Sequence, residues 1–179
     1  MNEIQKTEAW IRNFVVGLNI CPFAGGAVEK EQVRYLLSSA KDIDVLYQDL
    51  LKELLYLHET DPKEVETTVI VHPHVLSDFF LYLDFLEIAN ESLAEAGLEG
   101  EIQIASFHPD YHFEGEDPED VSNYTNRSPF PMLHLIREAS VSKAVESHPD
   151  IEGVPQRNID LLREMGLEKV KALVGLSES

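Results

Sequence analysis

The sequence predicts an α/β fold: a single compact domain over residues 1–179, with a small, mainly parallel sheet of about three or four strands and helices packed on it. Short apolar or alternating segments take turns with longer segments of helical periodicity, which is the order expected of strands joined by crossover helices. The length of 179 residues and the hydrophobic fraction of 44% suit one soluble domain. No run approaches the roughly 18 apolar residues that a membrane-spanning helix requires.

The first third of the chain predicts two helices and one strand. Thr7 can cap a first helix, which Pro22 and the glycines after it bring to an end. Residues 31–37 alternate apolar and polar side chains, a pattern typical of a half-buried strand. Asp42 begins a second helix with one apolar stripe, and Pro62 closes that region.

The middle third predicts the centre of the sheet. The β-branched run Thr67–Val71 is continuously apolar and indicates a strand buried on both faces. Ser77 can cap a third helix that runs to about Ala96, and residues 102–107 form a third strand. We expect four residues of these two strands to be fully buried: Val69, Ile70, Ile102 and Ile104.

The last third is predicted to be helical. Ser128 at a helix N-cap, with Pro129 at the first helical position, predicts the start of a fourth helix. Pro155 begins a fifth helix that stops at Gly166, and Leu167–Val174 forms a last helical segment.

The charge of the chain restricts its partners. Fourteen Lys and Arg stand against 33 Asp and Glu, a formal net charge of −19. Nucleic acid and anionic membrane are bound through cationic surfaces, so neither is an expected partner. A single cysteine excludes an internal disulfide framework, and the first residues contain no signal-type hydrophobic block, so we expect a cytoplasmic protein. Neither a cofactor nor an oligomeric state follows from the sequence.

Residues 106–137 contain the candidate functional site. This stretch is dense in His, Asn, Arg and Pro, and such loops carry function when a rigid scaffold holds them. If the strands are parallel, their carboxyl ends share one sheet edge, where ligands bind in open α/β sheets. We therefore predict a polar pocket for a small anionic ligand. The candidate catalytic residues are Cys21, His108 and His134, and the candidate ligand-binding residues are Asp110, His112, Asn126, Arg127, Ser128 and Arg137.

Each candidate has a chemical role and a structural alternative. Arg127, beside a capped helix start, could hold a carboxylate or phosphate, or it could pair with an acidic residue and hold the loop closed. His108 or His134 could act as acid or base near neutral pH, or could only hydrogen-bond. Cys21 could be a nucleophile or a packed side chain. We expect Cys21 and residues 126–128 to converge in space.

A metal site is the second possibility. His72 and His74 are two residues apart, so on an extended segment they point to the same side. With His108, His112 or Asp110 they could supply three nitrogen or oxygen ligands and leave an open coordination position. Histidine–proline pairs also occur at strand ends simply because proline terminates a ladder.

A binding protein without catalysis is the alternative from a different functional class. In that case the loop over residues 108–130 docks on a basic partner. An enzyme requires a concave pocket with these side chains in hydrogen-bond reach, whereas a docking surface leaves the loop exposed.

Four separated segments carry a resemblance to a known family: GLNICPFA, SFHPDYHF, TNRSPFPMLHLIRE and VPQRNIDLLREMG. Together, and in this order, they resemble an uncharacterised bacterial family described as a domain of unknown function. The Cys-Pro-Phe, Ser-Phe-His-Pro-Asp-Tyr and Asn-Arg-Ser-Pro-Phe-Pro segments look like its motifs. The resemblance implies a single domain of about this length, and it implies no activity.

Overall fold

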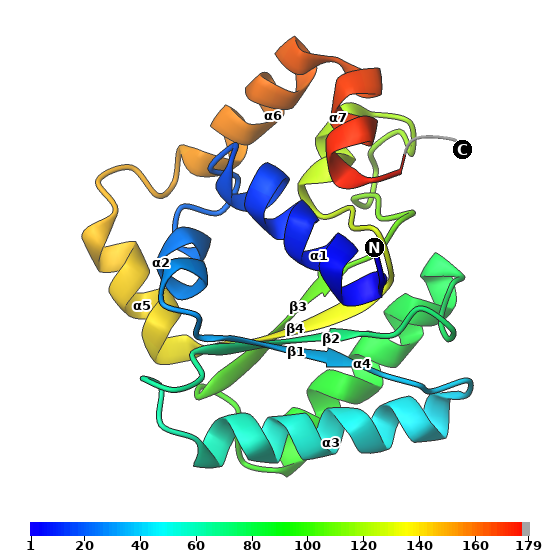
Figure 1. Ribbon diagram of the computed structural model, residues 1–179, viewed down its shortest axis with the longest axis vertical. Helices are drawn as coiled ribbons and strands as arrows, with labels where there is room; N and C mark the ends of the chain where they lie inside the picture. Colours follow the sequence, from blue (N-terminus) through cyan, green and yellow to red (C-terminus); the bar gives the residue numbers. More distant parts are fainter. Residues whose placement is uncertain (177–179) are drawn as a thin grey trace.

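The computed structural model describes residues 1–176 and has three layers, with a four-stranded sheet between two sets of helices (Figure 1). The strands are β1 (Val33–Leu37), β2 (Thr67–Val71), β3 (Ile102–Phe107) and β4 (Met132–Arg137). The α-helices are α1 (Glu3–Trp10), α2 (Ala24–Glu29), α3 (Ile43–Glu59), α4 (Phe79–Glu95), α5 (Glu138–Ser147), α6 (Val154–Met165) and α7 (Leu167–Val174). A π-helix, η1 (Ile11–Val16), continues α1, and a 3₁₀ helix, η2 (Val121–Thr125), precedes β4. None of the described helices is long and apolar enough to cross a membrane.

The sheet has the strand order β1-β2-β4-β3, and its pairing corrects the expectation of a mainly parallel sheet. Only β1 and β2 pair in parallel, whereas β4 runs antiparallel to both β2 and β3. Since β4 opposes both of its neighbours, β1, β2 and β3 still point in the same direction. Their carboxyl ends therefore share one edge, where Val71 and Phe107 both lie opposite Met132.

The strand β4 occupies the place where the sequence predicts the start of a fourth helix. Ser128 and Pro129 do not begin a helix; the chain enters β4 at Met132, and α5 begins only at Glu138. The backbone groups of β2 and β3 on their facing sides require hydrogen-bond partners in the interior, and β4 supplies them. Long-range pairing outweighs the local capping signal here.

The apolar core lies on both faces of the sheet. On one face, α3 and α4 cover side chains such as Ile70, Leu133 and Ile102. On the other face, α1 and η1 lie against the sheet, and α6 and α7 complete the core cluster that contains Val69 and Met132. The expected burial of the strands is confirmed for Val69, Ile70 and Ile102, whereas Ile104 is half-buried because β3 is an edge strand.

The N-terminal segment differs from the expected helix in its cap and its end. Asn2, not Thr7, caps α1, and it forms a capping box with Gln5. The helix widens into η1 and ends at Gly17, where a Cβ atom would lie against the carbonyl oxygen of Asn13. The following α2 and the later α5 add helices that the sequence did not predict at these bounds, and Asp78 rather than Ser77 caps α4.

Candidate functional site

The carboxyl edge of the sheet carries the expected polar residues, but they are buried. Ser38, His72 and His108 follow β1, β2 and β3, and none of the three is more than 2% exposed. Ser38 donates from its hydroxyl to Asp49 Oδ2 at 2.6 Å. The edge is therefore a packed polar layer rather than an open pocket.

His108 has no ring nitrogen left for catalysis. Its Nε2 lies 3.1 Å from the carbonyl oxygen of Leu76, and its Nδ1 accepts a hydrogen bond from the backbone N–H of Asp110 at 3.0 Å. The ring is therefore neutral with its proton on Nε2, and burial lowers the pKa of His108. Both contacts match the alternative in which His108 only hydrogen-bonds.

His72 is buried beside it and has one unpaired nitrogen. Its Nδ1 lies 3.0 Å from the carbonyl oxygen of Val75, whereas Nε2 has no partner among the described residues. Burial lowers the pKa of His72 to about 4. The ring stacks on Tyr82, whose hydroxyl donates to the Met132 carbonyl at 2.7 Å and accepts from the Phe107 N–H at 3.0 Å.

The four candidate metal-binding histidines do not form a ligand set. Within residues 1–176, no group of three or more His, Cys, Asp or Glu side chains is arranged to hold a metal ion. His72 and His108 are buried and bonded to backbone atoms, as above, whereas His74 is exposed. His112 lies on the loop, with its Nδ1 3.3 Å from the carbonyl oxygen of Asp110.

Arg127 holds the loop over residues 108–120 in place. Its Nε donates to the Tyr111 carbonyl at 2.9 Å and its Nη2 to the Pro118 carbonyl at 2.6 Å. The guanidinium also lies over the ring of Tyr124, 4.5 Å from the centroid. The arginine closes the loop through backbone carbonyls, not through the acidic side chains that the sequence suggested.

Its neighbours anchor the same loop to the sheet. Asn126 donates from Nδ2 to the Ser106 carbonyl at 3.2 Å and accepts from the His108 N–H at 3.2 Å through its own carbonyl. Ser128 is buried, and its hydroxyl donates to the Phe130 carbonyl at 2.7 Å, so it is not a helix cap.

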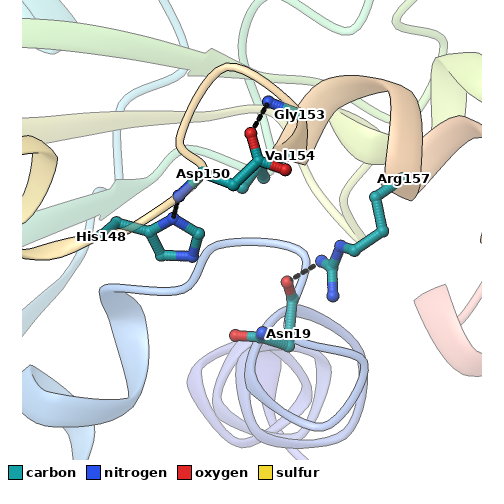
Figure 2. Close-up of a pocket in the computed structure, with 6 residues that line it drawn as sticks. All are labelled: Asn19, His148, Asp150, Gly153, Val154 and Arg157. Atoms are coloured by element: carbon teal, nitrogen blue, oxygen red, sulfur yellow. Dashed lines mark hydrogen bonds between the residues drawn. The ribbon is translucent and has the colours of Figure 1, made fainter.

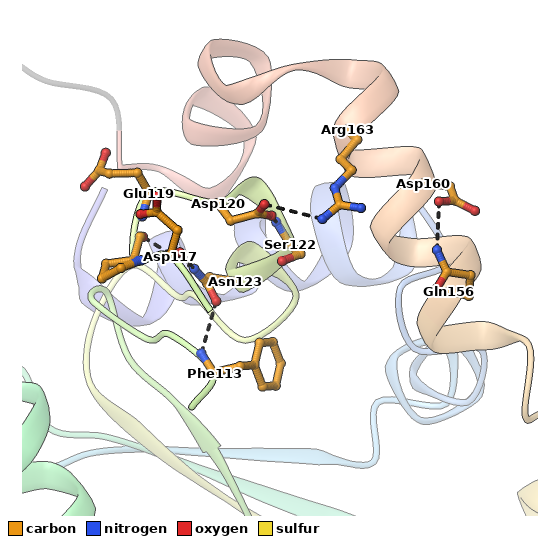
Figure 3. A network of polar contacts seen from close by, with 10 residues as sticks. Phe113, Asp117, Glu119, Asp120, Ser122, Asn123, Gln156, Asp160 and Arg163 are labelled. Atoms are coloured by element: carbon orange, nitrogen blue, oxygen red, sulfur yellow. Dashed lines mark hydrogen bonds and ion pairs between the residues drawn. The ribbon is translucent and has the colours of Figure 1, made fainter. Parts of the chain in front are cut away.

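Asn123 is a loop-organising residue that the sequence analysis missed. It is fully buried; its Oδ1 accepts from the Phe113 N–H at 3.0 Å, and its Nδ2 donates to the Asp117 carbonyl at 2.8 Å (Figure 3). Three residues before Asn123, Asp120 caps η2 and forms an ion pair with Arg163 of α6 at 3.3 Å. The signal available in the sequence was the Asp and Asn content, because these side chains bond to nearby backbone in turns.

His134 and Arg137 belong to opposite faces of the sheet. They are three residues apart on β4, and successive strand residues alternate between faces. His134 Nε2 lies 2.7 Å from Thr67 Oγ1, and burial lowers the pKa of His134 to about 4. Arg137 donates to the Thr60 carbonyl at 2.8 Å, at the end of β4 far from the carboxyl edge of β2. Neither side chain is near the predicted pocket.

Cys21 lies in the turn between η1 and α2, which is held by the start of α6. Asn158 donates from Nδ2 to the Ile20 carbonyl at 2.8 Å, and Arg157 donates from Nη2 to the Asn19 carbonyl. Figure 1 shows this turn at the far end of α1 and η1 from the segment that leads into β4. Among the described residues, no hydrogen bond joins Cys21 to residues 126–128.

Two of the surface hollows formed by the described residues lie beside segments discussed above. One, of about 350 Å³, lies between the first turns of α4 and the loop over residues 108–120. We call it the acidic groove, and its lining residues are Phe79, Phe80, Leu83, His112, Glu114, Gly115, Glu116 and Pro118. The other, of about 180 Å³, lies between the turn after η1 and the start of α6 (Figure 2).

Comparisons with known proteins place the chain in a family. The comparisons with curated proteins and with solved structures gave no match. A family model described as "Protein of unknown function (DUF1415)" matches residues 2–172. Because this match covers nearly the whole chain, the protein belongs to that family.

Proposed function

We propose that the protein is an interaction module that binds a basic polypeptide segment in the acidic groove. One observation carries this proposal: residues 64–126 contain fifteen Asp and Glu and no Lys or Arg. This stretch supplies α4 and the whole loop over residues 108–120, so both walls of the groove come from it. A cationic partner is the one that such a surface attracts and orients.

The floor of the groove is apolar and open to solvent. Phe80, which lines the groove from α4, is 65% exposed. Leu83 also faces the groove and is exposed. Large exposed apolar side chains that gather in a hollow, with polar groups around them, are typical of a binding surface. The expected partner therefore carries a bulky apolar residue as well as cations.

The rim of the groove matches a partner that carries arginine or lysine. Glu114 and Glu116 line the groove and are exposed, and neither forms an ion pair with another described residue. The ring of Phe80 adds a face over which a guanidinium can stack. Carboxylates beside an aromatic ring favour arginine in particular.

The loop wall is held in shape before any partner binds. Arg127 and Asn123 together bond to the backbone at Tyr111, Phe113 and Pro118. A wall fixed in this way loses little conformational entropy on binding. Under this proposal Arg127 organises the binding surface and does not contact the partner's charge.

An anion-binding enzyme fits the geometry less well. The arginine proposed to hold the anion uses its Nε and Nη2 on loop carbonyls, and both nitrogens of His108 are bonded. We also propose that the interaction takes place in the cytoplasm, because a lone cysteine suits a reducing compartment.

The test is a fluorescence anisotropy titration with a labelled peptide in which arginine alternates with leucine. We expect saturable binding that weakens as NaCl increases, and at least tenfold weaker binding when serine replaces either the arginines or the leucines. Phe80→Ala and the double change Glu114→Gln with Glu116→Gln should each weaken binding by about tenfold or more.

Matched variants separate a defined groove from general charge attraction. Leu55→Ala removes an apolar side chain of comparable exposure from α3, and Glu29→Gln with Glu31→Gln removes two exposed charges near α2. These controls should bind the peptide as the parent does. If groove and control variants lose affinity equally, the attraction is that of net charge alone and the proposed site is wrong.

A further inference from the structure

The second hollow, between the turn after η1 and the start of α6, is called the cavity below. We propose that this cavity binds a small zwitterion, namely an α-amino acid of the size of glycine, alanine or serine. Its volume is about 180 Å³, and its lining residues are Asn19, His148, Asp150, Gly153, Val154 and Arg157. The cavity shares no lining residue with the acidic groove, so this inference does not depend on the proposed function.

The volume restricts the ligand to a small metabolite. A water molecule occupies about 30 Å³ of liquid, so the cavity has room for roughly six water-sized groups. Drug-sized ligands occupy pockets of about 300–1,000 Å³. A small amino acid fits this space in full, whereas a nucleotide or a large aromatic ligand would extend out of it into solvent.

A cation and an anion border the cavity without pairing with each other. Arg157 directs Nη2 to the Asn19 carbonyl and to Asn158 Oδ1, the latter at 2.5 Å. Its Nε and Nη1 have no protein partner in the described chain. Asp150 accepts from the Gly153 N–H at 3.2 Å through Oδ1, while Oδ2 accepts no hydrogen bond from any described residue. Each charge therefore keeps atoms available to a ligand.

His148 adds a hydrogen-bond donor. Its Nδ1 accepts from the backbone N–H of Asp150 at 3.2 Å, so the neutral ring carries its proton on Nε2. The same His-Pro-Asp turn occurs at His108, where Nε2 bonds to the Leu76 carbonyl. At His148 no described residue takes that bond. Figure 2 shows His148 and Asp150 on one side of the cavity and Asn19 and Arg157 on the other.

This arrangement matches both charges of an amino acid. The ligand carboxylate can accept from the free guanidinium atoms of Arg157 and from His148 Nε2, and the ammonium can donate to Asp150 Oδ2. A simple anion would meet the carboxylate of Asp150, and a simple cation would meet Arg157. The ligand that satisfies the site carries both charges.

Two contacts join the turn after η1 to the start of α6. Asn158 is 5% exposed and ties the turn after η1 to α6 by donating to the Ile20 carbonyl at 2.8 Å. Asn19 has a φ of 53°, a conformation that asparagine tolerates better than most residues, and its carbonyl meets Arg157. The turn after η1 and the start of α6 are therefore held together before a ligand arrives.

The test is isothermal titration calorimetry of the full chain with glycine, L-alanine and L-serine, beside acetate and ethylamine as single-charge probes. We expect saturable binding of at least one of the three amino acids with a Kd of about 1 mM or lower, and at least tenfold weaker binding of acetate and of ethylamine. Absence of saturable binding by all three amino acids, or equal binding of acetate, would overturn the proposal.

Two variants and one control locate the binding. Asp150→Asn keeps the oxygen that accepts from Gly153 and removes only the charge, and Arg157→Gln removes the guanidinium. Each should weaken amino-acid binding at least tenfold. Glu152→Gln removes an exposed charge from the same turn without lining the cavity, and it should bind as the parent does. Circular dichroism checks that each variant is folded, and parent-like binding by folded Asp150→Asn and Arg157→Gln would place the ligand elsewhere.

Discussion

At the scale of the residue, Arg127 determines whether the loop wall of the acidic groove keeps its shape. We expect Arg127→Ala to lower the free energy of unfolding by about 2 kcal/mol, because it removes two charge-assisted hydrogen bonds and a cation–π contact. For a chain of this size, that corresponds to a drop in Tm of about 4–8 °C. Thermal melts of the variant and the parent measure it.

Two further variants serve as comparisons for the thermal melt of Arg127→Ala. Arg127→Lys should recover only part of the loss, since a single ammonium cannot reach both carbonyls in the geometry of the guanidinium. Arg163→Ala removes an exposed arginine whose ion pair with Asp120 is 3.3 Å long, and it should cost less than about 0.5 kcal/mol. If Arg127→Ala melts like the parent, Arg127 is free to serve a ligand and the anion site regains its main residue.

The second prediction at this scale concerns acid stability. Burial lowers the pKa of His72 to about 4, whereas an unfolded histidine titrates near about 6.5. Between these pH values the unfolded state binds a proton that the folded state does not, so the free energy of unfolding increases with pH. The contribution of the neutral His72 ring to the free energy of unfolding is complete above about pH 6.5. It is lost as the pH falls toward 4, and its upper limit is roughly 3 kcal/mol.

Urea unfolding between pH 7 and pH 4.5 measures the summed slope, to which His134 and His108 contribute in the same direction, and ring ¹⁵N chemical shifts assign the part that belongs to His72. The His72 ring should stay neutral, with its proton on Nδ1, at pH 5. His72→Gln should show a smaller pH dependence over the same range. A His72 ring that protonates near pH 6 would contradict the prediction.

The sequence identified polar residues of the right segment but not their use. Arg127, Asn126 and His108 do organise the loop at the carboxyl edge, yet their donors and acceptors meet the backbone. A sequence pattern records which groups are present and does not record which carbonyls fold back onto them. The unpaired charges are instead those of Glu114 and Glu116, on the loop over residues 108–130 that the sequence offered as a docking surface for a basic partner.

At the scale of the element, the strands and most helices followed from periodicity, whereas β4 did not. Ser128 and Pro129 have good local capping chemistry, but Met132–Arg137 is short and apolar enough to be a strand. Its partners lie about 30 and 65 residues earlier in the chain, and a local window contains neither. The shared carboxyl edge was predicted from an assumed parallel sheet, and it holds because β1, β2 and β3 keep one direction even with β4 inserted.

The junction of α4 with β3 and β4 gives a prediction at this scale. Tyr82→Phe removes one hydroxyl and leaves the Phe107 N–H and the Met132 carbonyl without that partner. We expect it to lower the free energy of unfolding by about 1–3 kcal/mol, because both groups stay buried. Tyr56→Phe, on the exposed side of α3, is the control and should be close to neutral. Equal effects in chemical denaturation would show that the Tyr82 hydroxyl does not join these elements.

At the scale of the whole molecule, the net charge of −19 predicts that salt stabilises the fold. Most of the acidic side chains are exposed, and fifteen of them belong to one stretch without Lys or Arg. Raising NaCl from about 0.01 M to about 0.15 M shortens the Debye length from about 30 Å to about 8 Å and weakens this repulsion. Differential scanning calorimetry should show a higher Tm with NaCl and with choline chloride alike. A Tm that stays constant or falls would mean that the repulsion is already offset within the fold.

Residues 64–126, which form β2, α4, β3 and the loop wall of the groove and contain no Lys or Arg, have a consequence for protease experiments. Trypsin cuts after lysine and arginine, so Lys63 and Arg127 are the first sites on either side of it. A complete digest releases residues 64–127 as one peptide. Resistance of the groove loop to trypsin therefore says nothing about its order, and a glutamate-specific protease, which has sites at Glu114 and Glu116, is the reagent that can report when a partner covers it.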